Sequence, residues 1–324
     1  MNQFFPARYS RLEPLELARL VQHIWNLPRI TRCIFFHSGE NDGYRLEQPD
    51  EPLFLRAYRL RYSDSSRVKA ELELLDAMKR CGAKVSAPIY AANGELFHCV
   101  QAVEGIRAIA VFDFAPGKML SRNSPDGWDI FGRELALLHQ TTPLLQDQAR
   151  SLRNYSLLDL LSEPADRWIK RLNSMSLSTS EVRRISDQLS SMIEPLWLEL
   201  PVGIVHGDTA GGNAHVDDNG SLTWFDFMWT GIAPFVWDIA TFRRGAGEIE
   251  ANWVPFLAGY ESVRKLNECE LRAVPILAAI RNIFVTDIII NECDSDLHAE
   301  ATPSWFQSRL DELKRLVDRI ESVS

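Results

Sequence analysis

The spacing of apolar residues changes along the chain, and this change limits the folds that the chain can adopt. From about residue 30 to residue 117, short apolar runs are separated by turn-forming residues, which is typical of antiparallel strands. From about residue 126 onward the spacing is helical, except for one β-like island at residues 202–228. We therefore predict an α+β chain of two lobes, an antiparallel β-rich N-lobe over residues 1–114 and a mainly helical C-lobe over residues 115–324.

Turn residues and helix signals divide both lobes into elements. Before the first strand, Leu17, Val21 and Ile24 have the spacing of an amphipathic helix, and Gly82 is placed to end a second helix. We read Ser38–Gly43 as a loop, and Asn93-Gly94 and Glu104-Gly105 as hairpin turns. Strands are expected at residues 32–37, 44–47, 52–58, 88–90, 96–100 and 106–114. Helices are expected at residues 66–80, 127–139, 157–173 and 180–198, with helical spacing again at 250–291 and 303–323.

Composition excludes several classes of protein. The chain has 324 residues and 36.9 kDa, and its 35 Lys and Arg against 44 Asp and Glu give a net charge of −9. This charge argues against binding to nucleic acid or to an anionic membrane by bulk electrostatics. No apolar run approaches the roughly 18 residues of a membrane span, and the start lacks a signal-peptide pattern. Five scattered cysteines without a CxxC pair fit a reducing cytoplasm.

The β-like island holds the residues that suggest chemistry. Asp208 and Asn213 lie five positions apart across a glycine-rich loop, so that both polar groups can turn toward one place. A strand, an Asp-Asp-Asn-Gly turn and a second strand then return the chain to Asp226. The alternative is a turn-rich loop in which Gly, Asn and Asp serve backbone geometry alone.

Phosphoryl transfer from Mg-ATP requires these three groups. One carboxylate orients or deprotonates the attacking hydroxyl, while an amide and a second carboxylate hold magnesium on the phosphates. The spacing Asp-x-x-x-x-Asn followed by a metal-binding Asp is that of kinases.

These segments resemble the aminoglycoside phosphotransferase group, with choline kinase and other small-molecule kinases nearby, all of which have the protein-kinase-like fold. The resemblance covers roughly residues 30 to 260 and is most specific over residues 205–240. It rests on His206–Asn213, the Phe-Asp-Phe around Asp226, Trp237–Ala240, Gly132–His139, Phe54–Arg56, Glu71 and Ala115–Gly117.

The resemblance implies a two-lobe kinase fold and a role for each matching residue. Asp208 would be the catalytic base, and Asn213 and Asp226 would bind Mg²⁺. Arg56 stands where the family has a strand lysine, because the first lysine of the chain is Lys69.

The remaining implied roles lie in the N-lobe. Glu71 would anchor the basic residue that contacts phosphate, although Glu73 is the neighbouring candidate. The backbone near Phe112, Asp113 and Phe114 would hold the adenine of ATP, and the Ser38–Gly43 loop would cover the phosphates. The acceptor would be a small-molecule hydroxyl of the aminoglycoside, amino-alcohol or homoserine kind.

Three further functions stay open. A protein Ser/Thr kinase would have the same fold, and a pseudokinase would fit the missing lysine. A metal-dependent hydrolase could use His206, Asp208, His215 and Asp226.

An acidic cluster follows the helical spacing of residues 250–291 and consists of Glu292, Asp294, Asp296 and Glu300. It is either a solvated loop or a patch that attracts a cationic acceptor.

Histidines and one further carboxylate have structural interpretations. We expect His206 to hold its loop by hydrogen bonding, His139 to pack in the core, and His215 to face solvent from a strand. Asp238 is expected to be a buried carboxylate that braces the loop.

Overall fold

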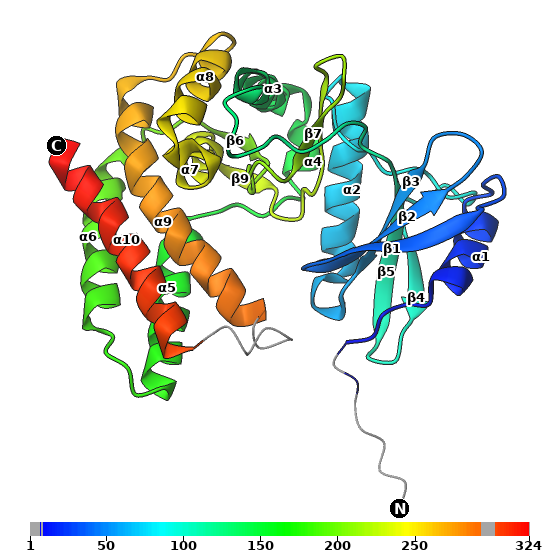
Figure 1. Cartoon of the computed structure of the whole chain (residues 1–324), viewed down its shortest axis with the longest axis horizontal. Helices are drawn as coiled ribbons and strands as arrows, with labels where there is room; N and C mark the ends of the chain where they lie inside the picture. Colours follow the sequence, from blue (N-terminus) through cyan, green and yellow to red (C-terminus); the bar gives the residue numbers. More distant parts are fainter. Residues whose placement is uncertain (1–6, 8, 293–301, 324) are drawn as a thin grey trace, which may run out of the picture. The chain divides into compact units, whose positions relative to one another are not determined.

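The computed structural model describes residues 7, 9–292 and 302–323. The chain forms two compact units. The first comprises Met1–Pro116, Leu144–Leu152 and Thr223–Phe225, and the second comprises Gly117–Pro143, Arg153–Leu222 and Asp226–Ser324. The first is built on an antiparallel sheet and the second is mainly helical, as the sequence predicts (Figure 1).

A five-stranded antiparallel sheet forms the first unit, with strand order β1-β2-β3-β5-β4. Tyr44, Leu46, Leu55 and Ile109 from its strands pack with residues of α1 in a continuous apolar core. The elements are α1 (Pro14–Ile24), β1 (Arg32–Ser38), β2 (Asn41–Glu47), β3 (Leu53–Tyr58), α2 (Ser65–Arg80), β4 (His98–Gln101), β5 (Ile106–Asp113) and the short α4 (Gln146–Ala149).

Helix α2 begins at Ser65, one residue before the expected start, and ends at Arg80 as the sequence predicts. The Asp64 side chain accepts a hydrogen bond from the Arg67 amide and caps the first turn. Gly82 follows the helix with a φ of +85°, the left-handed conformation that favours glycine.

Two predictions about the first unit are wrong. The turn between β1 and β2 is shorter than the expected Ser38–Gly43 loop, because the strands run to Ser38 and resume at Asn41. Residues 88–90 do not pair with residues 96–100. Instead the Ile89 amide donates to the Val111 carbonyl of β5. Strand β4 pairs only with residues 106–109 of β5, which leaves the rest of that β5 edge open to this segment.

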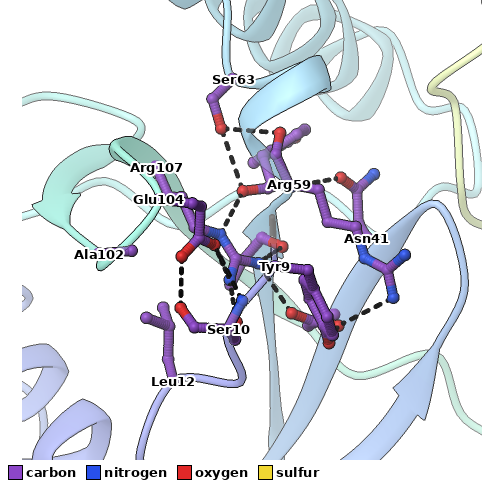
Figure 2. A network of polar contacts seen from close by, with 12 residues as sticks. Tyr9, Ser10, Leu12, Asn41, Arg59, Ser63, Ala102, Glu104 and Arg107 are labelled. Carbon is purple, nitrogen blue, oxygen red and sulfur yellow. Dashed lines mark hydrogen bonds and ion pairs between the residues drawn. The ribbon is translucent and has the colours of Figure 1, made fainter. Parts of the chain in front are cut away.

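A buried ionic network ties the N-terminal segment to the sheet (Figure 2). The guanidinium of Arg107, fully buried on β5, donates from Nη2 to Asp42 at 2.8 Å and from Nε to the Tyr58 carbonyl. Its Nη1 donates to the Ser10 carbonyl, and the Ser10 hydroxyl donates to Glu104. Every nitrogen of this guanidinium therefore has an acceptor, as a buried charge requires.

The second unit is built around one long helix, α9 (Glu268–Glu292), which packs against α5, α6, α7 and α10 (Figure 1). Two short strand pairs, β6 with β9 and β7 with β8, carry the loops of this region. The elements are α3 (Trp128–Gln140), a π-helix (Leu158–Ser162), α5 (Glu163–Ser174), α6 (Ser180–Trp197), β6 (Val202–Val205), β7 (Ala214–Val216), β9 (Gly231–Pro234), α7 (Val236–Arg244), α8 (Glu250–Glu261) and α10 (Pro303–Val323). Strand β8 (Leu222–Trp224) has Leu222 in this unit and Thr223 and Trp224 in the first. Sequence periodicity missed β9 and α7.

Helix α9 corrects one further expectation. Residues Glu268–Asn291 are long and apolar enough to cross a membrane by length and composition alone. In the structure 78% of that apolar window is buried, since the helix forms the centre of the second unit.

Candidate active site

The loop that follows β6 carries Asp208. Strand β6 pairs with β9, with Val205 opposite Gly231, and the chain then turns at Gly207, whose φ is +83°. A Cβ at Gly207 would lie 1.9 Å from the Trp229 carbonyl oxygen, so only glycine fits this turn. The turn therefore fixes the start of the Asp208 loop.

Two side chains hold the Asp208 carboxylate. Asn213 donates from Nδ2 to Asp208 Oδ2 and to the Asp208 carbonyl, both at 2.8 Å. Arg281 on α9 donates from Nη2 to Asp208 Oδ1 at 2.7 Å. The Asp208 side chain is still 30% exposed, so the carboxylate is fixed in orientation and remains accessible.

Asp238 braces the backbone of the same loop. Its carboxylate accepts the His206 amide at 2.7 Å and the Gly207 amide at 2.8 Å, and its carbonyl accepts the Thr209 hydroxyl. Since Asp238 is fully buried, this confirms the expected bracing carboxylate.

His139 and His206 are both buried and both take part in hydrogen bonding. His139 Nε2 lies 3.0 Å from Asp238 Oδ2, and its Nδ1 lies 2.8 Å from the Tyr260 hydroxyl. Burial lowers the pKa of His139, so its ring is neutral at neutral pH. His206 Nδ1 accepts the Asp208 amide at 3.3 Å, which confirms that His206 holds its loop.

Asp226 follows the predicted hairpin. The turn after β7 is closed by the Asp217 amide, which donates to the Ser221 carbonyl. Phe227, next to Asp226, packs its ring 4.3 Å from that of His206, which brings the Asp226 segment to the Asp208 loop. Asp226 has a φ of +65°, a strained conformation that is uncommon outside glycine and concentrates at functional sites.

The donor chemistry of Asn213 and Asp226 fits a hard divalent cation. Both bonds that Asn213 makes to Asp208 use Nδ2, so neither engages its amide oxygen. An amide oxygen and a carboxylate are ligands that Mg²⁺ takes together with substrate phosphates. Within residues 7, 9–292 and 302–323, no three His, Cys, Asp or Glu side chains group as a metal site.

The first unit brings Arg56 and Glu71 together. Arg56 Nη1 donates to Glu71 Oε1 at 2.8 Å, and both side chains are 8% exposed. The Tyr58 hydroxyl donates to the other Glu71 oxygen at 3.3 Å. Glu73 instead pairs with Lys69 near the surface, so Glu71 and not Glu73 is the partner of Arg56.

The segment from Phe112 to Phe114 ends β5. The Asp113 amide donates to the Ala87 carbonyl, and the Asp113 carbonyl accepts the Ser86 hydroxyl. The Asp113 carboxylate pairs with Lys79. The Asp113 amide is thus already used inside the first unit, and the rings of Phe112 and Phe114 lie beside those of Phe54 and Phe36.

Arg281 is the site residue that sequence reasoning missed. It is separated from Asp208 by 73 positions and lies in an apolar helix whose pattern gives no sign of the pairing. The signal that the sequence offers is a single basic residue, Arg281, within the largely apolar stretch of residues 273–286. The acidic cluster of Asp294, Asp296 and Glu300 lies outside the described residues, as does the Glu292 side chain.

One unit is built on a sheet and holds a buried Arg–Glu pair, and the other is helical and holds the braced Asp208 loop. These features define a chain of the protein-kinase-like class. The model of the phosphotransferase enzyme family matches residues 33–266. The chain therefore belongs to the phosphotransferase enzyme family, and it is a phosphotransferase that acts on an alcohol group.

Three proteins illustrate what this chain is similar to. An uncharacterized protein of Deinococcus radiodurans is 29% identical over 289 residues, which cover 86% of this chain and 83% of that protein. The homoserine kinase of Agrobacterium fabrum is 25% identical over 250 residues, covering 74% of this chain and 73% of the relative. The solved structure of amicoumacin kinase in complex with AMP-PNP, Ca²⁺ and Ami has a TM-score of 0.75 and 17% identity, and the match covers 98% of both chains.

Proposed function

We propose that the protein transfers the γ-phosphate of ATP to a hydroxyl of a small molecule, with Mg²⁺ as cofactor and Asp208 as the base. The observation that carries this proposal is the double restraint on Asp208. Its two oxygens accept from Asn213 and Arg281 at 2.8 and 2.7 Å, while the side chain stays accessible.

Asp208 has the geometry of a base that orients the acceptor. A carboxylate oxygen has more than one lone pair, so each oxygen can accept a second hydrogen bond in addition to the one it already has. An acceptor hydroxyl that donates to Asp208 would be aligned for attack, and its proton would pass to the carboxylate.

Asn213 and Asp226 would hold the magnesium ion. The ion supplies neutralisation of the charge on the phosphate oxygens. Asn213 would bind it through its amide oxygen, while its Nδ2 keeps Asp208 in place. One asparagine side chain would thereby bind the metal through its oxygen and hold Asp208 through its nitrogen.

Arg56 and Glu71 would form the phosphate contact of the first unit. The buried pair fixes the Arg56 guanidinium, which also faces the Phe112 ring at 5.3 Å. Arginine keeps the charge of the usual lysine and offers several donors to phosphate oxygens. The Asp113 amide already bonds to the Ala87 carbonyl. The adenine of ATP would therefore be held by the other backbone groups of residues 112–114.

The acceptor would be an aminoglycoside-, amino-alcohol- or homoserine-like molecule. Support for this range comes from the names of the proteins similar to this chain, a homoserine kinase and an amicoumacin kinase. A protein hydroxyl is the alternative acceptor, and the reaction would take place in the cytoplasm.

Thermal unfolding and ADP release test this proposal together. Mg-ATP at about one hundred times its dissociation constant should stabilise the protein by about 2.7 kcal/mol, and the shift should require Mg²⁺. A panel of amino alcohols, homoserine and aminoglycosides should then contain a compound that stimulates ADP release. No magnesium-dependent shift at millimolar Mg-ATP would contradict the nucleotide site. Phosphorylation of casein without turnover of any small molecule would favour the protein-kinase alternative.

A further inference from the structure

Arg281 reaches the Asp208 loop from α9, the long helix around which the second unit is built. Its side chain is 3% exposed, against 30% for Asp208, so the charge that meets Asp208 comes from the protein interior. Helix α9 packs against α5, α6, α7 and α10, which makes its backbone a rigid base for this side chain.

Aromatic rings hold the Arg281 guanidinium. Its carbon lies 5.5 Å from the centre of the Trp237 ring and 5.1 Å from that of Phe284. These two rings pack edge to face with their centres 5.7 Å apart. The guanidinium therefore interacts with two aromatic rings as well as with the Asp208 carboxylate.

The hydrogen bonding of Arg281 does not fit a purely structural arginine. Within the described part of the chain its Nε and Nη1 atoms are buried and have no hydrogen-bond partner. The buried Arg107 of the first unit (Figure 2) offers the comparison, because each of its three nitrogens donates to an acceptor. Leaving buried donors unpaired costs stability, and an apolar side chain over the same rings would avoid that cost.

Two neighbouring residues of α7 support the Asp208 loop in different ways. Asp238 fixes the loop backbone through the His206 and Gly207 amides. Trp237 supports the Arg281 guanidinium, which in turn fixes Asp208 Oδ1. Without Arg281, Asn213 would hold only Oδ2, and the carboxylate could turn about its Cβ–Cγ bond.

We propose that Arg281 is a positioning residue for phosphoryl transfer, which sets the orientation of the Asp208 carboxylate relative to the acceptor hydroxyl. The inference rests on the proposed role of Asp208 as base. It assigns Arg281 an effect on turnover and none on the binding of nucleotide.

Arg281→Met tests this directly, since methionine can occupy the space over the two rings without donating a hydrogen bond. We expect kcat to fall about 100-fold, the size of effect that a misplaced catalytic group produces. The KM for ATP should stay within about threefold of that of wild type. Mg-ATP should raise the Tm of the variant as it raises that of wild type. Arg272→Met, an exposed position on the same helix, is the matched control and should leave kcat unchanged.

A double mutant separates positioning from a general structural role. Because Arg281 acts through Asp208, adding Arg281→Met to Asp208→Asn should not lower the residual rate further. Guanidinium ion at non-denaturing concentration should raise the kcat of Arg281→Ala and leave that of Asp208→Asn unchanged.

Several outcomes would overturn the inference. A kcat for Arg281→Met within threefold of wild type would do so, as would a further loss in the double mutant or a parallel loss of Mg-ATP binding. A wild-type protein with neither an Mg-ATP shift nor ADP release would instead refute the proposed function, and the role of Arg281 would be refuted with it.

Discussion

The imidazole of His139 lies 3.0 Å from the carboxylate of Asp238, and both side chains are fully buried in the second unit. Asp238 in turn accepts the His206 and Gly207 amides, two positions and one position before Asp208. A buried histidine on α3 thus supports the loop that carries Asp208, through a single carboxylate.

Asp238→Asn should destabilise the protein and lower its activity. The substitution places an amide donor where two backbone amides and His139 converge, so at least one buried donor loses its acceptor. We expect a loss of about 1 to 3 kcal/mol in the free energy of unfolding, measured by urea titration. Asp166→Asn, at an exposed position of α5, is the control and should change stability little. Equal stability of the two variants would contradict the bracing role.

The pKa of His139 predicts how stability depends on pH. Burial lowers this pKa below its ordinary value of 6.5, so the unfolded chain binds a proton that the folded protein does not. The stabilising contribution of the neutral, buried His139 imidazole is complete above pH 6.5 and is lost as the pH falls below that value. His139→Phe should be less stable than wild type at pH 7.5, because its Asp238 bond is gone, and the difference should shrink toward pH 5.5. Urea unfolding at several pH values measures this difference, and a constant difference would contradict the prediction.

Glu71→Gln should weaken the binding of Mg-ATP without abolishing it. The neutral amide no longer holds the Arg56 guanidinium by charge, so the proposed phosphate contact loses its fixed position. We expect the KM for ATP to rise about tenfold, which corresponds to about 1.4 kcal/mol of binding free energy. Glu73→Gln on the same helix is the control, because Glu73 pairs with Lys69 near the surface. A Glu71→Gln variant with the KM of the control would show that the pair does not serve the nucleotide.

Asp226→Asn should raise the concentration of Mg²⁺ needed for activity. Asparagine tolerates the left-handed backbone of this position, so the fold is expected to be kept while the proposed anionic ligand of Mg²⁺ is lost. We expect the half-saturating concentration of Mg²⁺ to rise at least about tenfold. Loss of a group that only supports a metal ligand already weakens metal binding by about 10- to 100-fold. Asp218→Asn, exposed in the preceding turn, should require the same Mg²⁺ concentration as wild type. An unchanged requirement in Asp226→Asn would remove Asp226 from the metal site.

Local signals predicted much of the fold. The closing glycine of α2 and the Glu104-Gly105 turn of the β4–β5 hairpin formed as expected. The Asn93-Gly94 turn did not join two paired strands, because the open edge of β5 competes for residues 87–89 and no local pattern records that edge.

Contacts among the candidate site residues were predicted where the residues are close in sequence. Asp208 and Asn213 meet in one loop, and Arg56 meets Glu71 across a strand and the next helix. Arg281 could not be predicted, since its pairing with Asp208 depends on how α9 packs against α7, which is a property of tertiary structure.

Asp208→Asn tests the central claim most directly. The substitution preserves the size of the side chain and removes the base, so Mg-ATP should still raise the Tm of the variant as it does that of wild type. Single-turnover transfer to the best acceptor should be slower by between about 100-fold and 10,000-fold, the usual contribution of a general base. A rate within a few-fold of wild type would contradict the assignment of Asp208 as the base of this phosphotransferase.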